Sequence, residues 1–476
     1  MTQPVRVEHD LLGERAVPAD AYYGIHTLRA LENFPITGTA ISIYPDLVAA
    51  LACVKQAAAI ANSELGLLEE KRAVAIRLAC EEIREGRLHQ EFVVDVIQGG
   101  AGTSTNMNAN EVICNRALEL LGHAKGEYGQ LHPLDHVNMS QSTNDVYPTS
   151  VKLALQFGIR RLAAEMDALR KAFESKALEF ASVLKVGRTQ LQDAVPMTLG
   201  QEFSTYAVML EEDRERLAEA AALIREINLG ATAIGTGINV HPDYARLVTR
   251  RLSEISGVEL VVSPNLIEAT QDAGAFVQLS GVLKRIAVKL SKTCNDLRLL
   301  SSGPRAGLGE ITLPAVQAGS SIMPGKVNPV IPEVVNQIAF EVIGNDVTVT
   351  MAAEAGQLQL NAFEPIIAHS LFEAIQHLAA GCRTLADRCV KGIKANAGRA
   401  RQLLDESTAL VTALNPHIGY ARSSEIAQEA LRTGVKVYDL VLQKGLMTRE
   451  QLDQVLRPEM LTQPHSAARR KPRSET

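Results

Sequence analysis

The feature that most constrains the fold is a long apolar seam of helical period that begins near Asn144. Apolar side chains recur along it at alternating spacings of four and three residues, at Leu155, Ile159, Leu162, Met166, Leu169 and Phe173. Such spacing places side chains on one face of an α-helix. Four comparable segments follow, at roughly 198–229, 273–300, 332–360 and 363–394. The sequence therefore predicts five long helices that pack as a bundle.

The composition agrees with closely packed helices and indicates several structural parts. Aromatic residues supply only 4% of the chain and tryptophan is absent, so Ala, Leu, Ile and Val must build the core. A chain of 476 residues exceeds the size of a single core. We expect a mainly α protein with a mixed, mostly helical N-terminal domain over 1–142, the five-helix domain over 143–398 and a small helical domain over 399–476.

The expected C-terminal domain shows helix boundaries in its sequence. A helix from Val435 to Lys444 ends at Gly445, and Thr448 and Gln451 have the spacing of a capping box that starts the next helix. The last residues, Ser466 to Thr476, are basic and lack apolar partners, which is typical of a disordered end.

The expected long helices carry more apolar surface than one bundle can bury. Ile286, Val288 and Leu290, together with Leu283, occupy more than one face of their helix. A helix that is apolar all round requires burial on all sides. We therefore expect a closed oligomer, a dimer or a dihedral tetramer, built through these helices.

Charge, cysteines and hydropathy exclude several classes of protein. A formal net charge of -6 gives no general attraction to nucleic acid or to an anionic membrane. The six cysteines form no Cys-x-x-Cys pair, so the sequence suggests neither a zinc site nor a disulfide framework. No apolar run has the length of a signal peptide or a membrane span. These features indicate a soluble cytoplasmic protein with buried free thiols.

The most informative polar segment is a glycine-containing loop from Gly319 to Pro329. It contains the hydroxyls of Ser320 and Ser321, the ammonium of Lys326 and the amide of Asn328. The glycines allow backbone N–H groups to approach a ligand, and the ammonium is a compact positive charge. These groups suit removal of a carbon-bound proton next to a carboxylate, whereas composition alone favours a surface turn.

Two further polar clusters precede helices, where backbone donors are exposed. The first, Gly100 to Asn106, contains the hydroxyl of Thr103, which can donate to a carboxylate. The second contains Ser142, Thr143 and Asn144 directly before the first long helix, whose N-terminus attracts anions. Taken alone, the first cluster is a weak signal, because such runs commonly cap helices, and the second is better explained as an ordinary helix cap.

A fourth cluster, from Gly187 to Ala194, separates the first two long helices. Thr189 and Gln190 are its candidates for contact with a ligand. We expect Arg188 and Asp193 to form a structural ion pair rather than to contact a substrate.

The loop at 319–329 resembles the signature of the aspartase/fumarase superfamily, Gly-Ser-Ser-x-Met-Pro-x-Lys-x-Asn, at every fixed position. The other three clusters resemble the remaining characteristic regions of that superfamily, in the same order, so the resemblance extends over nearly the whole chain. Within the superfamily, the sequence is closer to the aspartate ammonia-lyases. Class II fumarases carry Ser-Ser-Asn-Asp and Thr-His, where this chain has Ser-Thr-Asn-Asp from Ser142 and Thr-Gln at Thr189 and Gln190.

The resemblance implies reversible anti-elimination of ammonia from L-aspartate, which gives fumarate through an aci-carboxylate intermediate. It implies that Ser320, on a mobile loop, is the base. The implied substrate contacts are Thr103, Ser142, Thr143 and Ser321 at the β-carboxylate, Lys326 and Asn328 at the α-carboxylate, and Asn144, Thr189 and Gln190 at the amino group. It also implies a homotetramer whose multi-helix core joins the bundles and whose active sites are each shared between three subunits. No cofactor and no metal ligand is implied as required, and activation by a divalent cation such as Mg²⁺ is left open.

Three other functions are alternatives to this one. A class II fumarate hydratase would perform the same elimination with hydroxide as the leaving group. A structural protein that kept the bundle without activity is disfavoured by the intact Ser320, Lys326 and Asn328. A helical binding module leaves the four polar clusters unexplained. We assign no catalytic role to His132, His136 or His417, because a histidine at a helix end or an interface more often satisfies a local hydrogen bond.

Overall fold

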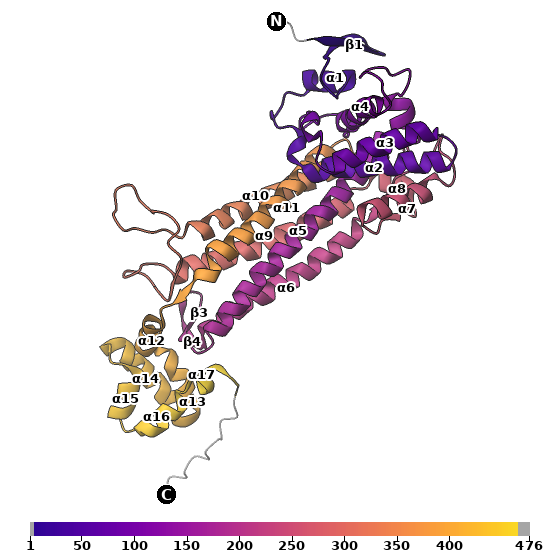
Figure 1. Ribbon diagram of the computed structural model, residues 1–476. Coiled ribbons are helices and arrows are strands. Elements are labelled where there is room, and N and C mark those ends of the chain that lie inside the picture. The colour runs from indigo at the N-terminus through magenta and orange to yellow at the C-terminus, as the bar shows by residue number, and fades with distance from the viewer. Residues whose placement is uncertain (1–3, 465–476) are drawn as a thin grey trace. The chain divides into compact units, whose positions relative to one another are not determined.

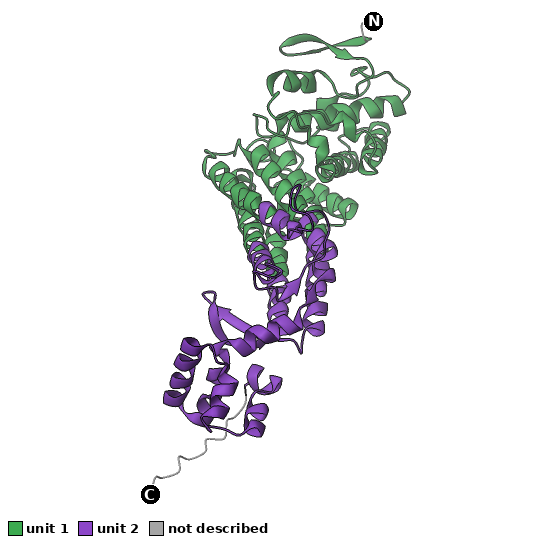
Figure 2. Cartoon of the chain, turned by 90° about the vertical axis from the view of Figure 1, so that its left-hand side faces the viewer, with its two compact units in different colours: residues 1–164, 213–288, 338–379 green, residues 165–212, 289–337, 380–476 purple. Residues whose placement is uncertain are grey.

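The computed structural model describes residues 4–464 and is mainly helical (Figure 1). The chain divides into two compact units, each assembled from three segments (Figure 2). Unit 1 comprises Met1–Ala164, Asp213–Val288 and Ile338–Ala379, and unit 2 comprises Glu165–Glu212, Lys289–Gln337 and Ala380–Thr476. The predicted disordered end from Ser466 lies outside the described residues.

The five predicted long helices are present. They are α5 (Thr143–Glu179), α6 (Leu199–Leu223), α9 (Gly274–Leu300), α10 (Val330–Glu354) and α11 (Glu364–Arg388). Each of them passes from one unit to the other, so each unit contains a part of all five. The mainly helical fold is thus confirmed. The predicted division into three continuous domains, with boundaries after residues 142 and 398, stays a prediction.

Within unit 1, the predicted apolar seam is buried. Leu155, Ile159 and Leu162 on α5 are at most 5% exposed. Polar contacts join neighbouring helices at fixed points: Ser280 Oγ on α9 donates to Asp346 Oδ1 on α10 at 2.8 Å. Burial of the apolar face, rather than helix propensity alone, stabilises helices of this length.

The remainder of unit 1 includes an alanine-rich helix, α2 (Pro45–Glu64), among shorter helices and strands. Its elements are β1 (Val5–Asp10), β2 (Gly13–Pro18), α1 (Ile25–Asn33), α2 (Pro45–Glu64), α3 (Glu70–Arg84), α4 (Thr103–Leu120), α7 (Tyr244–Ser256), α8 (Leu266–Gln271) and the short parallel pair β5 (Glu226–Ile227) and β6 (Val261–Val262). The strands β1 and β2 form an antiparallel hairpin. Helix α2 packs against α3, α4 and α7, and its small side chains permit this close approach from several sides.

Unit 2 contains an aromatic cluster, a hairpin and a small helical region. Phe173 on α5 lies against Tyr206 on α6, with ring centroids 5.3 Å apart. Between these helices, β3 (Leu184–Thr189) and β4 (Gln192–Thr198) form an antiparallel hairpin. The other elements are the short pair β7 (Ile311–Thr312) and β8 (Lys394–Ala395), and α12 (Ala397–Glu406), α13 (Val411–Ile418), α14 (Tyr420–Thr433), α15 (Val437–Gln443), α16 (Arg449–Val455) and α17 (Pro458–Thr462).

Two local predictions for this helical region are confirmed. The residue Gly445, with φ of 62°, follows α15, as the sequence indicates for a helix end. Thr448 and Gln451 form a reciprocal capping box at the start of α16, with N···O distances of 3.0 and 3.2 Å.

All six cysteines are buried and free, as predicted.

Candidate active site

The N-terminus of α5 gathers the polar side chains of the second cluster in unit 1. Ser142 Oγ accepts a hydrogen bond from the N–H of Asn144 at 3.2 Å. Thr143 Oγ1 accepts one from Nδ2 of Asn106, on α4, at 3.0 Å. Two hydroxyl groups therefore lie at the positive end of a long helix, where an anion is stabilised.

A buried carboxylate joins this helix end to a distant loop of unit 1. Asp145 Oδ2 accepts the N–H groups of Gly230 at 3.1 Å and Thr232 at 2.9 Å, while Oδ1 accepts that of Ser142 at 3.0 Å. Burial raises the pKa of Asp145 to about 6, although these backbone donors favour the ionised form. Asn144 Nδ2 donates to Ala233 O at 2.7 Å, which leaves its Oδ1 as an acceptor.

A buried lysine that we did not predict from the sequence lies beside the same cluster. Lys55, on α2, donates from Nζ to Oδ1 of Asn106 at 2.7 Å and to Oδ1 of Asn138 at 2.9 Å. Burial lowers the pKa of Lys55 to about 7, and the charge of Asp145 opposes this shift. The signal in the sequence is a lone lysine within the apolar run of α2.

The first cluster forms the start of α4 and depends on a glycine. Gly102 has φ of 87°, and a Cβ there would come within 2.3 Å of the Tyr147 ring on α5, so only glycine fits. Thr103, the first residue of α4, is exposed and donates its hydroxyl proton to Gly100 O at 2.7 Å. The close approach of α4 to α5 brings Asn106 to the α5 N-terminus.

The hairpin of unit 2 places Thr189 and Gln190 at its tip. Gln190 and Leu191 form the two-residue turn, with φ of 53° and 62°. Both residues are exposed and neither is glycine, so the left-handed conformation is unfavourable at each position. Such local strain is frequent at functional sites.

The expected ion pair between Arg188 and Asp193 is wrong. Arg188 Nη2 pairs instead with Oε1 of Glu310 at 2.9 Å, and Lys185 Nζ lies 3.1 Å from its Oε2. Glu310 is fully buried, whereas Asp193 is exposed. An unpaired buried carboxylate is far more costly than an unpaired exposed one, so Glu310 takes the cations.

The loop from Gly319 to Pro329 turns around the hydroxyl of Ser320. Its Oγ accepts hydrogen bonds from the N–H groups of Ile322 at 3.2 Å and Met323 at 3.0 Å. The two ends of the loop are joined, since Asn328 Nδ2 donates to Gly319 O at 2.8 Å. Two N–H groups directed at one oxygen favour its negatively charged form.

The predicted site residues divide between the two units. Unit 1 contains Thr103, Ser142, Thr143 and Asn144, and the structure brings the last three together at the start of α5. Unit 2 contains Thr189, Gln190, Ser320, Ser321, Lys326 and Asn328. Within it, Asn328 closes the loop that carries Ser320, and Ser321 and Lys326 are exposed.

The histidines near the first two clusters act as local hydrogen-bond acceptors. His132 Nδ1 accepts the N–H of Leu134 at 3.2 Å, and His136 Nδ1 accepts that of His132 at 2.8 Å. These bonds occupy Nδ1 of each ring in short-range structure, as a capping role requires.

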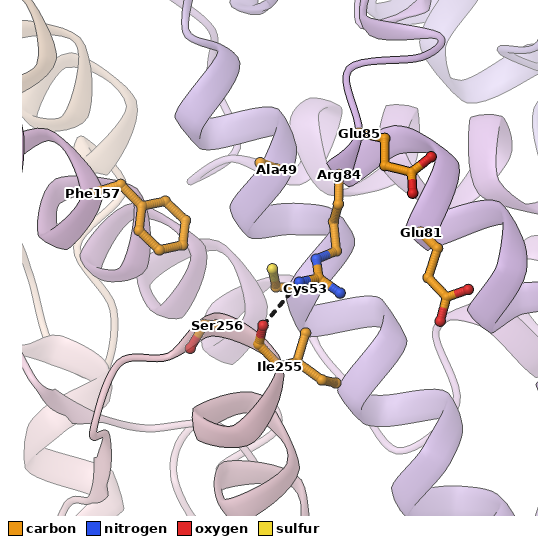
Figure 3. Close-up of a pocket in the computed structure, with 8 residues that line it drawn as sticks. All are labelled: Ala49, Cys53, Glu81, Arg84, Glu85, Phe157, Ile255 and Ser256. Carbon is orange, nitrogen blue, oxygen red and sulfur yellow. Dashed lines mark hydrogen bonds between the residues drawn. The ribbon is translucent and has the colours of Figure 1, made fainter.

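A cavity of about 370 Å³ in unit 1 lies among α2, α3, α5 and α7 (Figure 3). It is lined by Ala49, Cys53, Glu81, Arg84, Glu85, Phe157, Ile255 and Ser256. The Arg84 guanidinium already donates to Gln56 Oε1 and to Ile255 O, each at 2.8 Å. A dicarboxylate would meet two like charges there, from Glu81 and Glu85, so this cavity is not the candidate site.

Comparison with known proteins gives consistent matches over the whole chain. Residues 13–344 match a family model described as Lyase, and residues 410–463 match one described as Fumarase C C-terminus. The chain is 58% identical to an aspartate ammonia-lyase of Helicobacter pylori, covering 98% of this chain and 100% of the relative. It is 60% identical to one of Pseudomonas fluorescens, covering 96% of each, and 53% identical to one of Escherichia coli, covering 99% and 98%.

Solved structures agree with these sequence relatives. A fumarate lyase:delta crystallin from Brucella melitensis, bound to cobalt, superposes with a TM-score of 0.95 at 58% identity, covering 97% of this chain and all of that one. A class II fumarase from Schistosoma mansoni superposes with a TM-score of 0.92 at 35% identity, with the same coverage.

Proposed function

The chain belongs to the aspartase/fumarase superfamily, and we propose on that premise that it is an aspartate ammonia-lyase. It removes ammonia from L-aspartate by reversible anti-elimination and releases fumarate. The proposal is supported by relatives of that name that are 53–60% identical over nearly their full length. The Thr-Gln pair at Thr189 and Gln190, where class II fumarases carry Thr-His, agrees with this choice.

The single geometric observation that carries the chemistry is the pair of N–H groups directed at Ser320 Oγ. A serine hydroxyl is a poor base in water, and an alkoxide needs donors that stabilise its charge without transferring a proton. The N–H groups of Ile322 and Met323 are donors of this kind. Ser320 thus removes the C3 proton of the substrate.

The dianionic aci-carboxylate that follows needs donors at its β-carboxylate. Ser142 and Thr143 meet this need at the positive end of α5, because each hydroxyl oxygen already accepts a bond and its proton is available. Ser321 adds a further hydroxyl. Thr103 contributes after rotation of its side chain away from Gly100 O.

The other end of the substrate contacts the remaining predicted residues. Lys326 and Asn328 hold the α-carboxylate, by a compact charge and an amide N–H. The amino group needs acceptors, which are Oδ1 of Asn144, the hydroxyl of Thr189 and the amide oxygen of Gln190. An amide cannot exchange a proton near neutral pH, and none is needed here, because the substrate ammonium is already protonated and leaves as ammonia with the electron pair of the C–N bond.

The loop acts as a lid in this proposal. Ile322 is 84% exposed and Met323 is 47% exposed, although both side chains are apolar. Closure over a bound substrate would bury them and exclude water from the base. Gly319 and Gly325 are the flexible points.

The active protein is a homotetramer in which three subunits contribute to each site. An exposed apolar stripe on α10 supports this proposal, since Phe340, Val347 and Met351 are 62%, 55% and 66% exposed. Their spacings of seven and four residues place them on one helix face, and a second copy of the chain is the partner that covers it. Light scattering after size exclusion tests the tetramer, and a monomeric variant should be inactive.

The proposal also includes a cytoplasmic location and no required cofactor. Activation by Mg²⁺ is tested by assaying the protein in the presence and absence of a chelator. Within residues 4–464, no helix is both long and apolar enough to cross a membrane.

The activity is tested by incubating the purified protein separately with L-aspartate, L-malate and argininosuccinate while the absorbance of fumarate is followed. L-Aspartate should react readily. In the reverse direction, with fumarate as the substrate, the absorbance of fumarate should fall only when ammonia is added. Turnover of L-malate without turnover of L-aspartate would identify a fumarate hydratase instead.

A further inference from the structure

A fully buried lysine lies behind the start of α5 in unit 1. Lys55 is 0% exposed, and only two side-chain oxygens, Oδ1 of Asn106 and Oδ1 of Asn138, are within hydrogen-bond distance of its Nζ among the described contacts. Removal of an ammonium from water carries a large cost that two neutral oxygens offset only in part. An uncharged side chain would pack there at lower cost, so the charge needs an explanation other than packing.

The charge of Lys55 determines the orientation of the Asn106 amide. An ammonium has donors only, so the side of Asn106 that faces it must be the oxygen. The Asn106 nitrogen then faces the opposite way, where it donates to Asn138 Oδ1 at 3.2 Å and to Thr143 Oγ1 at 3.0 Å. Asn110 Nδ2 also donates to Asn138 Oδ1, at 3.2 Å, so Asn138 is held as an acceptor.

The orientation of Asn106 in turn determines the role of the Thr143 hydroxyl. Because its oxygen accepts from Asn106, its proton must point away from the network. Thr143 is the first residue of α5 and is only partly buried, so this proton is accessible at the positive end of the helix.

We propose that Lys55 is a positioning residue which, through Asn106, holds the Thr143 hydroxyl as a donor to the β-carboxylate of the substrate. The inference rests on the proposed function, and Lys55 itself does not touch the substrate. Without the ammonium, the Asn106 oxygen has no donor among the described residues, and the amide is held only through its nitrogen, by Asn138 at 3.2 Å and Thr143 at 3.0 Å. It can then turn over, at the expense of the bond to Asn138, and present its oxygen to Thr143. The hydroxyl then donates to Asn106 and is lost to the substrate.

The test is a double-mutant cycle with Lys55→Met, Thr143→Val and the double variant in the full-length assembled protein. The dissociation constant of succinate, an unreactive dicarboxylate, is measured by titration calorimetry. Lys55→Met should weaken binding roughly ten- to a hundredfold, the factor expected for one hydrogen bond to a charged group. In the Thr143→Val background, the same substitution should change binding less than about twofold.

Lys152→Met is the matched control. Lys152 is also buried in unit 1, at 7% exposure, and donates to Glu226 O at 2.8 Å. Its loss should lower the unfolding temperature without changing the affinity for succinate. A purely structural role of Lys55 predicts equal weakening with and without the Thr143 hydroxyl, and that result, or wild-type affinity in Lys55→Met, overturns the inference.

Asn106→Asp replaces Lys55→Met if the latter does not fold. The carboxylate keeps an ion pair with Lys55 but offers Thr143 an acceptor in place of a donor. Its weakening of succinate binding should be about tenfold smaller in the Thr143→Val background, and an equal effect in both backgrounds contradicts the inference. Absence of fumarate formation from L-aspartate by the wild type would instead overturn the proposed function.

Discussion

The start of α5 in unit 1 and the loop from Gly319 to Pro329 in unit 2 use similar side chains in opposite ways. At α5, the supporting groups Lys55, Asn106 and Asp145 are buried. Hydrogen bonds connect them across distant segments of the chain, from α2 to α4 and from the loop at Gly230 to α5. In the loop, the hydrogen bonds of Ser320 and Asn328 connect residues of the loop itself, and most side chains of the loop are exposed.

The difference matches two demands of the proposed reaction. A carboxylate is bound best by donors that are already oriented before it arrives, because no free energy is then lost in reorganising them. A serine base must be protected from water yet admit the substrate, which requires a segment that moves. We therefore assign the preformed binding of the β-carboxylate to the ordered cluster, and proton removal together with binding of the α-carboxylate to the loop.

The largest expected effect is on the loop. Ser320→Ala should lower kcat roughly 10²- to 10⁴-fold, the usual contribution of a general base, while the unfolding temperature stays near that of the wild type. The hydroxyl is in an open loop and contributes little packing, so stability should not depend on it. Steady-state assay and thermal unfolding measure the two quantities, and wild-type turnover would remove Ser320 from the base role.

For the ordered cluster at α5, the expected effect is a loss of unfolding free energy. Gly102→Ala forces a Cβ against the Tyr147 ring in a left-handed backbone conformation, which should cost about 3 kcal/mol of unfolding free energy or more. Gly122→Ala is the matched control, since Gly122 has φ of 84° but nothing within 4 Å of the added Cβ. Denaturant titration should find a clearly larger loss for Gly102→Ala. Equal losses would mean that the close approach of α4 and α5 does not matter.

A smaller effect is expected where the loop contacts the α-carboxylate. Lys326→Arg should raise the KM for L-aspartate about tenfold, because a planar fork does not replace a compact ammonium in a tight site. Lys391→Arg provides the control on another exposed lysine of unit 2, which pairs with Asp387 at 2.6 Å. An unchanged KM in Lys326→Arg would make Lys326 a bystander.

The smallest effect is expected for the substitution that imitates a fumarase. Gln190→His should leave the rate on L-malate negligible, since Thr143 and the stretch from Ala101 to Thr105 also differ from the fumarase pattern. Histidine tolerates the left-handed backbone of this turn, so misfolding should not confuse the result. A variant with all three regions in fumarase form is the comparison, and rapid malate turnover by the single variant would contradict this view of selectivity.

The regular parts of the fold could be predicted because local sequence determines them. The apolar period from Leu155 predicted α5, and the spacing of Thr448 and Gln451 predicted the capping box. The partner of Arg188 could not be predicted, because Asp193 lies opposite it in the hairpin while Glu310 is distant in sequence and competes only once it is buried. The role of Lys55 was missed for the same reason, since its partners come from α4 and the segment before α5.

The polar clusters could be recognised as motifs in the sequence. The difference between the buried, hydrogen-bonded cluster at α5 and the exposed loop could not be predicted from it. Sequence order gives no sign that Asn106 donates to Thr143, or that the Gln190 turn adopts a left-handed conformation without glycine. Both depend on contacts or strain imposed by the surrounding structure.

The most direct test of the division between binding and reaction measures succinate binding and fumarate formation in the same Ser320→Ala protein. The account predicts a dissociation constant for succinate within about twofold of wild type, together with loss of fumarate formation from L-aspartate. Loss of succinate binding in that variant, or retained turnover, would contradict the separation of dicarboxylate binding, begun at the α5 cluster, from proton removal by Ser320.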